Sequence, residues 1–150
     1  YKPGYKFNEW EMKGIPLRIE FGPKDLEKKH CVVVRRDIKE KQFVKLKDIK
    51  KEIPVILDKM HDDMYDRALK FLEASKTETT DYEAMKQLIA AKKLVKTYHC
   101  GEEECEDYIK DESEGASSRC IPFDAKEPKG KKCVRCGKSA KYELFFSKSY

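Results

Sequence analysis

The alternation of apolar and polar positions in the first third of the chain predicts a small sheet. Residues 15–21 alternate between apolar and other side chains, which is typical of a half-buried strand. The β-branched run at residues 31–34 predicts a second strand, and residues 42–46 predict a third that should pair with it as a hairpin. Residues 25–29 can form one or two helical turns between the first two strands.

A long amphipathic helix should follow, with Asp48 as its N-cap. Its apolar residues recur every three to four positions and form one stripe, which we expect to pack into a core. Pro54 should kink this helix or shift its start, because proline removes a helical hydrogen bond. The stripe comprises Ile49, Ile53, Ile56, Leu57, Met60, Met64, Ala68 and Phe71.

A polar break at residues 77–80 precedes a second module, whose first helix should be capped by Asp81. Further strands are predicted at residues 94–98, 119–123 and 141–146, and a short helix at residues 105–110. The mixture of strands and helices predicts an α/β fold of the α+β kind, with domains at residues 1–76 and 77–150.

Composition argues against a membrane-spanning protein. The 150 residues are 41% charged, their mean hydropathy is −0.81, and no run of ~18 apolar residues occurs. No signal segment is recognisable at the start of the sequence, so nothing points to secretion. Trp10, eight tyrosines and seven phenylalanines favour a packed core over a disordered chain.

The positive charge is concentrated in one region of the sequence. The formal net charge is +5, and residues 1–50 hold 14 basic and 8 acidic side chains. A locally basic surface attracts phosphate backbones without reading their sequence, so nucleic acid is one possible partner. A solvated, lysine-rich surface is the alternative.

Four cysteines have the spacing of a zinc site. Cys100 and Cys105 form one pair and Cys133 and Cys136 another, followed by Gly137, which can adopt a positive φ. Two close pairs of thiolates supply the four soft ligands that zinc prefers, and leave no open position for water. The sequence therefore predicts a structural zinc ion. A thioredoxin-like redox pair is the main alternative for Cys133 and Cys136.

The remaining metal-binding side chains have other interpretations. His99 adjoins Cys100 and could replace one ligand, although four cysteines already suffice. Cys31 lies in an apolar strand and is expected to be a small core residue. Core packing is also the expectation for Cys120.

Two sets of motifs resemble prolyl-tRNA synthetase of the archaeal and eukaryotic type. Residues 13–25 (KGIPLRIEFGPKD) and 34–37 (VRRD) are similar to the anticodon-binding domain of that family. The C-terminal zinc-binding domain of the family is resembled by Cys100, Cys105, residues 119–123 (RCIPF), Cys133, Cys136 and residues 147–150 (SKSY). The resemblance covers nearly the whole chain.

This resemblance implies a C-terminal portion of a class II synthetase. It implies a mixed-sheet anticodon-binding domain that lacks its first elements, followed by a small α/β zinc-binding domain. The parent enzyme would join proline to tRNA(Pro) with ATP and Mg through a prolyl-adenylate. Its catalytic residues would lie before this chain. The family also implies a cytoplasmic protein that binds no membrane and forms a homodimer through the catalytic domain.

The expected anticodon contacts combine this resemblance with base chemistry. The proline anticodon ends in two guanines, whose O6 and N7 accept from Arg or Lys and whose N1–H and N2–H suit a carboxylate. Unstacked loop bases also need an aromatic platform. The residues that fit are Phe7, Glu11, Arg18, Lys24 and Arg36. Alternatives remain: Phe7 could be core, Glu11 and Lys24 solvated, and Arg18 and Arg36 in contact with phosphate or solvent.

The last residue and the overall function each have two interpretations. In the family, the terminal tyrosine, here Tyr150, is expected to dock toward the catalytic domain, and a frayed end is the alternative. The alternative function is a non-catalytic, zinc-stapled module that binds protein or RNA.

Overall fold

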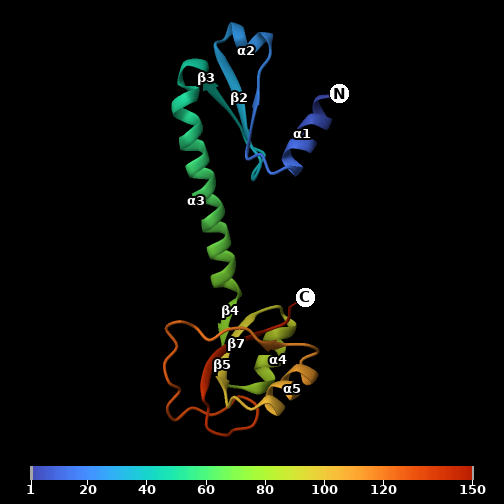
Figure 1. Ribbon diagram of the computed structural model, residues 1–150, viewed down its shortest axis with the longest axis vertical. Coiled ribbons are helices and arrows are strands. Elements are labelled where there is room, and N and C mark those ends of the chain that lie inside the picture. The colour runs from blue at the N-terminus through green and yellow to red at the C-terminus, as the bar shows by residue number, and fades with distance from the viewer. Residues whose placement is uncertain (1, 150) are drawn as a thin grey trace. The chain divides into compact units, whose positions relative to one another are not determined.

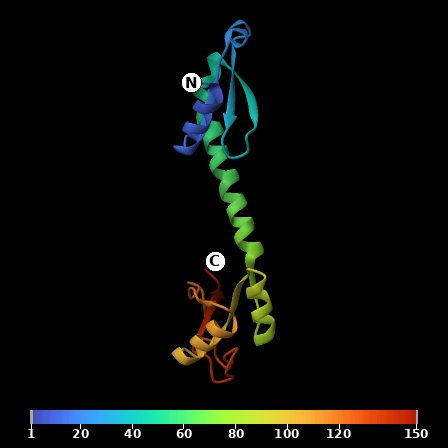
Figure 2. The same ribbon diagram turned by 90° about the vertical axis from the view of Figure 1, so that its right-hand side faces the viewer.

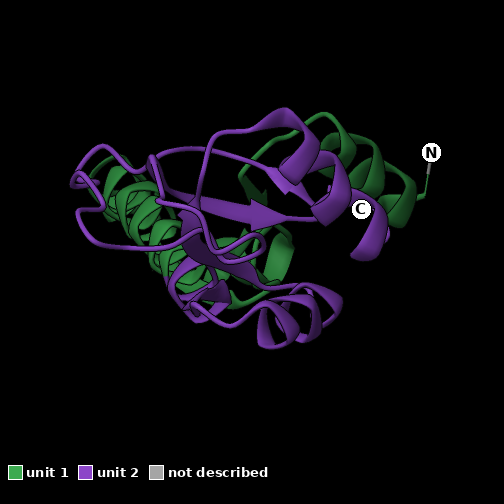
Figure 3. Ribbon diagram, turned by 90° about the horizontal axis from the view of Figure 1, so that it is seen from below, with its two compact units in different colours: residues 1–69 green, residues 70–150 purple. Residues whose placement is uncertain are grey.

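The computed structural model describes residues 2–149. The chain divides into two compact units, residues 1–69 and 70–150, shown in different colours in Figure 3. Each unit combines helices with a β-sheet, so the predicted α+β class is confirmed. None of the described helices combines the length and apolar composition that crossing a bilayer requires.

Unit 1 is built on a three-stranded antiparallel sheet in the order β1-β2-β3 (Figure 1). Its strands are β1 (Leu17–Glu20), β2 (His30–Arg35) and β3 (Lys41–Lys45), which confirms all three predicted strands and the hairpin. A short helix, α2 (Pro23–Glu27), connects β1 to β2 as expected. The helix α1 (Pro3–Met12), with a proline in its first turn, was not predicted.

The core of unit 1 lies between this sheet and the first part of the long helix α3 (Ile49–Ser75). Cys31 is fully buried there, which confirms it as a core residue. The cluster consists of Cys31, Val33, Val44 and Ile56, with Leu17, Leu46, Ile49 and Ile53 packed against it.

The start and the stripe of α3 differ from the prediction. A 3₁₀ turn, η1 (Leu46–Asp48), leads into the helix, so Asp48 belongs to that turn and Pro54 lies inside the helix. Among the described residues of the stripe, Ile56 and Met60 are buried, but Met64 and Phe71 are 44% and 76% exposed. The stripe is therefore core only in its first half, because the sheet of unit 1 packs only against that part.

Unit 2 contains a four-stranded mixed sheet in the order β4-β5-β7-β6. Its first two strands are parallel, and the others pair antiparallel. The elements are β4 (Lys76–Glu78), α4 (Tyr82–Ala90), β5 (Leu94–His99), α5 (Glu103–Glu112), β6 (Ser117–Ser118) and β7 (Tyr142–Ser147). The helices α4 and α5 cover one face of this sheet (Figure 1, Figure 2).

The core of unit 2 lies under these two helices. Its buried residues are Met85, Ile89, Val95, Ile109, Ala116, Val134, Leu144 and Phe146. The Asp81 side chain accepts a 2.7 Å hydrogen bond from the Ala84 backbone N–H, which confirms the predicted N-cap of α4.

Three predictions in unit 2 were wrong. The predicted polar break at residues 77–80 overlaps the strand β4, which pairs in parallel with β5. The residues expected to form a strand at 119–123 do not, because Pro122 has no N–H to donate and Ile121 and Phe123 are exposed. Cys120 is exposed rather than packed in a core.

Candidate functional site

Unit 1 holds a pocket of about 410 Å³ between α1 and the start of β1. Its walls are mainly apolar, and its charged groups come from both elements. The lining residues are Lys6, Phe7, Trp10, Glu11, Ile15, Leu17 and Arg18. The structure therefore brings together three residues predicted to contact the anticodon, Phe7, Glu11 and Arg18.

Arg18 is held in one orientation by contacts on three sides. Its guanidinium carbon lies 3.9 Å from the centroid of the Phe7 ring, above the ring. Its Nη1 donates to Glu11 Oε1 at 2.7 Å, and its Nε donates to Glu20 Oε1 at 3.0 Å. The Arg18 side chain remains 23% exposed, so a ligand in the pocket can reach it.

Glu11 is held in its ionised form by two cations. Hydrogen bonding from Lys39, with a further contribution from Arg18, lowers the pKa of the Glu11 carboxyl below its usual value. The carboxylate therefore acts only as an acceptor, which is the property needed to bind the N1–H and N2–H of guanine.

The other two predicted contacts lie outside the lining of this pocket. Arg36 Nη1 donates to the Glu11 backbone carbonyl at 3.3 Å and so ties α1 to the end of β2. Lys24 lies on α2 and is exposed. Sequence reasoning missed Trp10 as a lining residue, although it stands three positions after Phe7 and a predicted α1 would have placed both on one helix face.

In unit 2, the four predicted cysteines lie together. Cys105 Sγ and Cys133 Sγ are 3.7 Å apart, and Cys136 Sγ and Cys100 Sγ are also 3.7 Å apart. Four sulfurs at ~2.3 Å from a tetrahedral zinc ion would be separated by roughly 3.8 Å. The two observed distances therefore fit opposite edges of such a tetrahedron.

Three separate segments position these sulfurs. Cys100 follows the last residue of β5, and Cys105 lies in the first turn of α5. Cys133 and Cys136 lie in a tight turn closed by a 3.0 Å hydrogen bond from Gly137 N–H to the Cys133 carbonyl. Gly137 has φ +71°, the positive value expected from the sequence.

The thiols differ in how easily they lose a proton. Burial opposes ionisation of Cys133, but the backbone amides of Cys136, Arg135 and Cys100 donate toward its sulfur and lower its pKa to about 7. Burial raises the pKa of the Cys100 and Cys105 thiols. A cation among the four sulfurs would compensate the charge that burial disfavours.

His99 is a further potential ligand. Ligand atoms of His99, Cys100, Cys105 and Cys133 all lie within 4.8 Å of one another, and Cys136 is not part of this group. The His99 Nδ1, however, accepts a 3.1 Å hydrogen bond from the Gly101 N–H. In a neutral imidazole the proton is then on Nε2, which is buried without a hydrogen-bond partner among the described residues and in this tautomer has no lone pair for a metal. Burial lowers the pKa of His99 and favours this neutral form.

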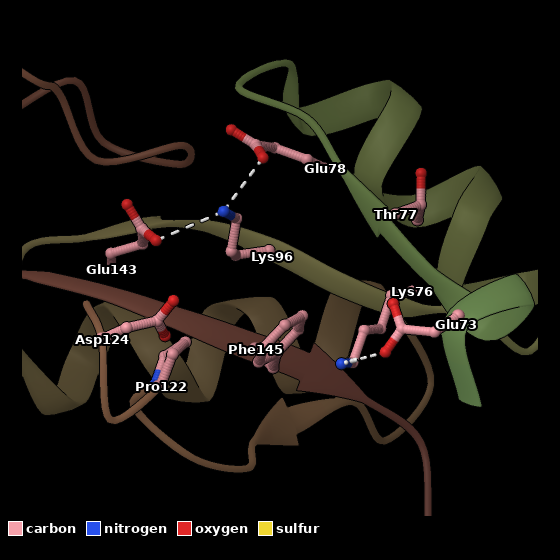
Figure 4. A pocket seen from close by; sticks show the side chains of 9 residues that line it. All are labelled: Glu73, Lys76, Thr77, Glu78, Lys96, Pro122, Asp124, Glu143 and Phe145. Atoms are coloured by element: carbon pink, nitrogen blue, oxygen red, sulfur yellow. Dashed lines mark hydrogen bonds and ion pairs between the residues drawn. The ribbon is translucent and has the colours of Figure 1, made fainter. Parts of the chain in front are cut away.

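Unit 2 has a hollow of about 430 Å³ on the face of its sheet opposite α4 and α5 (Figure 4). Lys96 Nζ lies between Glu78 and Glu143, at 3.1 and 3.3 Å, and Lys76 pairs with Glu73 at 2.8 Å. The Lys96 pairs link β5 to β4 and β7, and the Lys76 pair links β4 to the end of α3. We interpret all three as structural. None of the predicted site residues lines this hollow.

The C-terminal segment is tied to the body of unit 2 near its end. The Arg119 guanidinium donates to the Ser147 carbonyl at 2.7 Å and to Ser149 Oγ at 2.9 Å. Tyr150, for which docking was predicted, lies outside the described residues.

Comparison with known proteins matches both units. A family model described as "Prolyl-tRNA synthetase, C-terminal" matches residues 82–150, and one described as "Anticodon binding domain" matches residues 1–56.

Several curated proteins are similar over nearly the whole chain. Proline--tRNA ligase 2 of Bacillus thuringiensis (strain Al Hakam) is 44% identical over 149 residues, which are 99% of this chain and 31% of the relative. Proline--tRNA ligase of Oceanobacillus iheyensis is 42% identical over 148 residues, which are 99% of this chain and 30% of the relative. Proline--tRNA ligase of Clostridium novyi (strain NT) is 40% identical over 149 residues, again 99% of this chain and 31% of the relative. The chain thus spans about a third of the length of these relatives.

Proposed function

The chain belongs to the prolyl-tRNA synthetase family, and we propose that unit 1 reads the anticodon of tRNA(Pro) while unit 2 is held together by a structural zinc ion. The matched anticodon-binding region, residues 1–56, includes every residue that lines the pocket between α1 and β1. The observation that carries the proposal is the arrangement of Phe7, Glu11 and Arg18 in that pocket.

This arrangement provides the groups that recognise guanine. Arg18 offers N–H donors to the O6 and N7 of the base, and Glu11 accepts from its N1–H and N2–H. Phe7, Trp10 and the guanidinium plane of Arg18 provide flat surfaces on which an unstacked base can lie. Without RNA, Arg18 and Glu11 pair with each other at 2.7 Å, so neither charge is left unpaired.

Lys24 and Arg36 are proposed as contacts outside this pocket. Arg36 combines a positive charge with its hydrogen bond to the Glu11 carbonyl, so it supports α1 and can also approach phosphate. Lys24 is exposed on α2 and suits a phosphate contact more than a base contact.

We propose that Cys100, Cys105, Cys133 and Cys136 hold the zinc ion as thiolates. The 3.7 Å sulfur separations support this ligand set, and the hydrogen bond at His99 Nδ1 argues against histidine as the fourth ligand. Zinc bound by four protein ligands would cross-link β5, α5 and the 133–137 turn without taking part in chemistry.

The proposed parent protein is a proline--tRNA ligase that uses ATP and Mg in a catalytic domain outside this chain. A homodimer formed through that domain, a cytoplasmic location, and docking of Tyr150 toward it belong to the same proposal. The archaeal and eukaryotic type of the family and the domain boundary after residue 76 stay predictions. Similarity to relatives named proline--tRNA ligase supports the activity of the parent.

The test is binding of the chain to proline tRNA transcripts with the two anticodon guanines intact or replaced. Direct anticodon reading predicts a loss of roughly 1–3 kcal/mol for each replaced base. Equal binding to both transcripts contradicts it and leaves the zinc-stapled interaction module as the function of the isolated chain.

A further inference from the structure

A second hollow of unit 1 shares no lining residue with the pocket. Four lysines from two separate segments surround a hollow of about 540 Å³, which we call the lysine cleft. The cleft consists of Lys28, Lys29, Lys45, Leu46 and Lys47. All four lysines are exposed, and Leu46 is half-buried at the floor.

The backbone holds the two lysine pairs next to each other. Lys28 and Lys29 follow the end of α2, and Lys45 ends β3. The Leu46 N–H donates to the Lys29 carbonyl at 3.0 Å and so joins the two segments. Lys29 has φ +54°, a left-handed conformation that residues other than glycine rarely adopt.

The charges of the cleft are not neutralised within the protein. Among residues 2–149, no carboxylate lies within 4.0 Å of the amino groups of Lys28, Lys29, Lys45 or Lys47. Lys39 and Lys41 of the same unit, in contrast, pair with Glu11 and with Glu20, the latter at 3.7 Å. Glu27 and Asp48 occur in the same segments, but neither forms an ion pair with the four lysines.

We propose that the lysine cleft binds the phosphate backbone of the RNA whose anticodon unit 1 reads. Lysine ammonium groups act as point charges toward phosphate. The cleft has no aromatic residue on which a base could stack, and Leu46 cannot read a base edge. Its contribution is therefore electrostatic and independent of sequence.

The cleft and the pocket can serve one RNA because the same short strand leads from one to the other. Arg18 lies near the start of β1, which ends at Glu20 and is separated from α2 by two residues, and Lys28 and Lys29 follow α2. Across the sheet, Glu20 of β1 pairs with Val32 of β2, and His30 at the start of β2 pairs with Lys45 of the cleft. This inference rests on the proposed function, since it takes tRNA as the ligand.

The test compares charge removal in the cleft with the same charge removal elsewhere. The cleft variant combines Lys28→Gln, Lys29→Gln, Lys45→Gln and Lys47→Gln. The control combines Lys70→Gln, Lys92→Gln, Lys110→Gln and Lys126→Gln, four exposed lysines of unit 2 without ion pairs among the described residues. Fluorescence anisotropy of labelled tRNA transcripts is measured across a range of salt concentrations, with guanines intact or replaced.

We expect the cleft variant to lower the slope of log K against log salt by about 3 if all four lysines contact phosphate. Affinity at low salt should fall at least roughly tenfold and by the same factor for both transcripts, because phosphate contacts carry no sequence information. In the control variant, both the salt slope and the affinity at low salt should change much less. Since Lys29 has an unusual backbone conformation, a triple variant that retains Lys29 provides a second measurement if the quadruple variant is unfolded by circular dichroism.

An unchanged slope in folded cleft variants, or an equal decrease in the control, overturns the lysine cleft as an RNA site. Failure of the proposed function gives a different result, in which the unmodified chain binds both transcripts equally. The two ideas therefore fail separately.

Discussion

The guanidinium of Arg18 lies over the ring of Phe7, with 3.9 Å between the guanidinium carbon and the ring centroid. The two residues come from different elements, α1 and β1, and Glu11 fixes the arginine from a third direction at 2.7 Å. A cation over an aromatic face is stabilised electrostatically, and its plane extends the flat surface that a base can use. The pair therefore fixes the orientation of Arg18 within the protein itself.

Replacing Phe7 should weaken RNA binding without unfolding the unit. Phe7→Ala removes the surface beneath Arg18, and loss of one base-stacking contact costs about 1–3 kcal/mol. Anisotropy with the proline tRNA transcript measures this loss. The matched control is Phe71→Ala, an exposed aromatic residue of α3 outside the pocket, which should bind RNA normally. Equal binding by both variants would mean that Phe7 is only a structural residue.

Removing one cysteine of the cluster should reduce zinc content and stability together. Cys105→Ser leaves three thiolates, and its partner Cys133 at 3.7 Å loses a neighbour in the ligand set. We expect metal analysis to show less zinc and the Tm to fall by about 5 °C or more, given roughly 2–4 °C per kcal/mol for a chain of this size. Cys120→Ser, at an exposed cysteine outside the cluster, is the control. Full zinc content in Cys105→Ser would contradict the four-cysteine site.

Gly101 should be intolerant of a side chain. It has φ +81°, and a Cβ there would lie 2.7 Å from Tyr142 Cε2. Gly101→Ala therefore combines an unfavourable conformation with a steric clash next to Cys100, and should destabilise the chain by about 1–3 kcal/mol. Gly130→Ala separates the two effects, because Gly130 has φ +71° with open space around its Cβ position. If urea unfolding shows the same loss of stability for both variants, the clash with Tyr142 does not contribute to the effect of Gly101→Ala.

A buried ion pair in unit 1 should make stability depend on pH in the acid range. Arg35 Nη2 and Asp37 Oδ2 are 2.9 Å apart with both side chains about 5% exposed, and Arg35 also pairs with Asp63 at 2.7 Å. Hydrogen bonding from Arg35 lowers the pKa of Asp37 from 3.8 to about 2, against the opposing effect of burial.

Because the folded-state pKa lies below the unfolded value, this stabilisation is present above pH 3.8 and is lost as the pH falls toward 2. We expect Asp37 to account for on the order of 2 kcal/mol of unfolding free energy over that interval. Asp37→Asn should flatten that part of the pH profile measured by urea unfolding, while Glu40→Gln at an exposed site should retain it. If the unfolding free energies of the chain and of Asp37→Asn depend on pH in the same way, Asp37 is not the source of the acid-range dependence.

The sequence predicted the cluster of cysteines better than the pocket, for a physical reason. Close cysteine pairs are constrained by local geometry, so Cys100, Cys105, Cys133 and Cys136 could be identified from spacing alone. Phe7 and Arg18 meet only because α1 folds onto β1. That contact has no local signature, and the family resemblance was needed to select the two residues.

Errors in the fold arose where tertiary pairing outweighed local pattern. β4 has the polar sequence Lys76–Glu78 and forms because it pairs in parallel with β5. The residues at 119–123 have the apolar composition of a strand, but Pro122 prevents regular pairing. The periodicity of α3 correctly predicts a helix, but it cannot show how far along the helix a sheet packs.

The most direct test of anticodon reading is a double-mutant cycle between Arg18 and the anticodon guanines. Arg18→Met keeps an unbranched, apolar stem and removes the guanidinium with its positive charge and N–H donors. The chain and this variant are each titrated with transcripts in which the guanines are intact or replaced. Contact between Arg18 and a guanine predicts a coupling energy of about 1–3 kcal/mol, so that the variant no longer distinguishes the transcripts at that base. Additive losses, with full discrimination retained by Arg18→Met at both guanines, would contradict the proposal that Arg18 reads the anticodon.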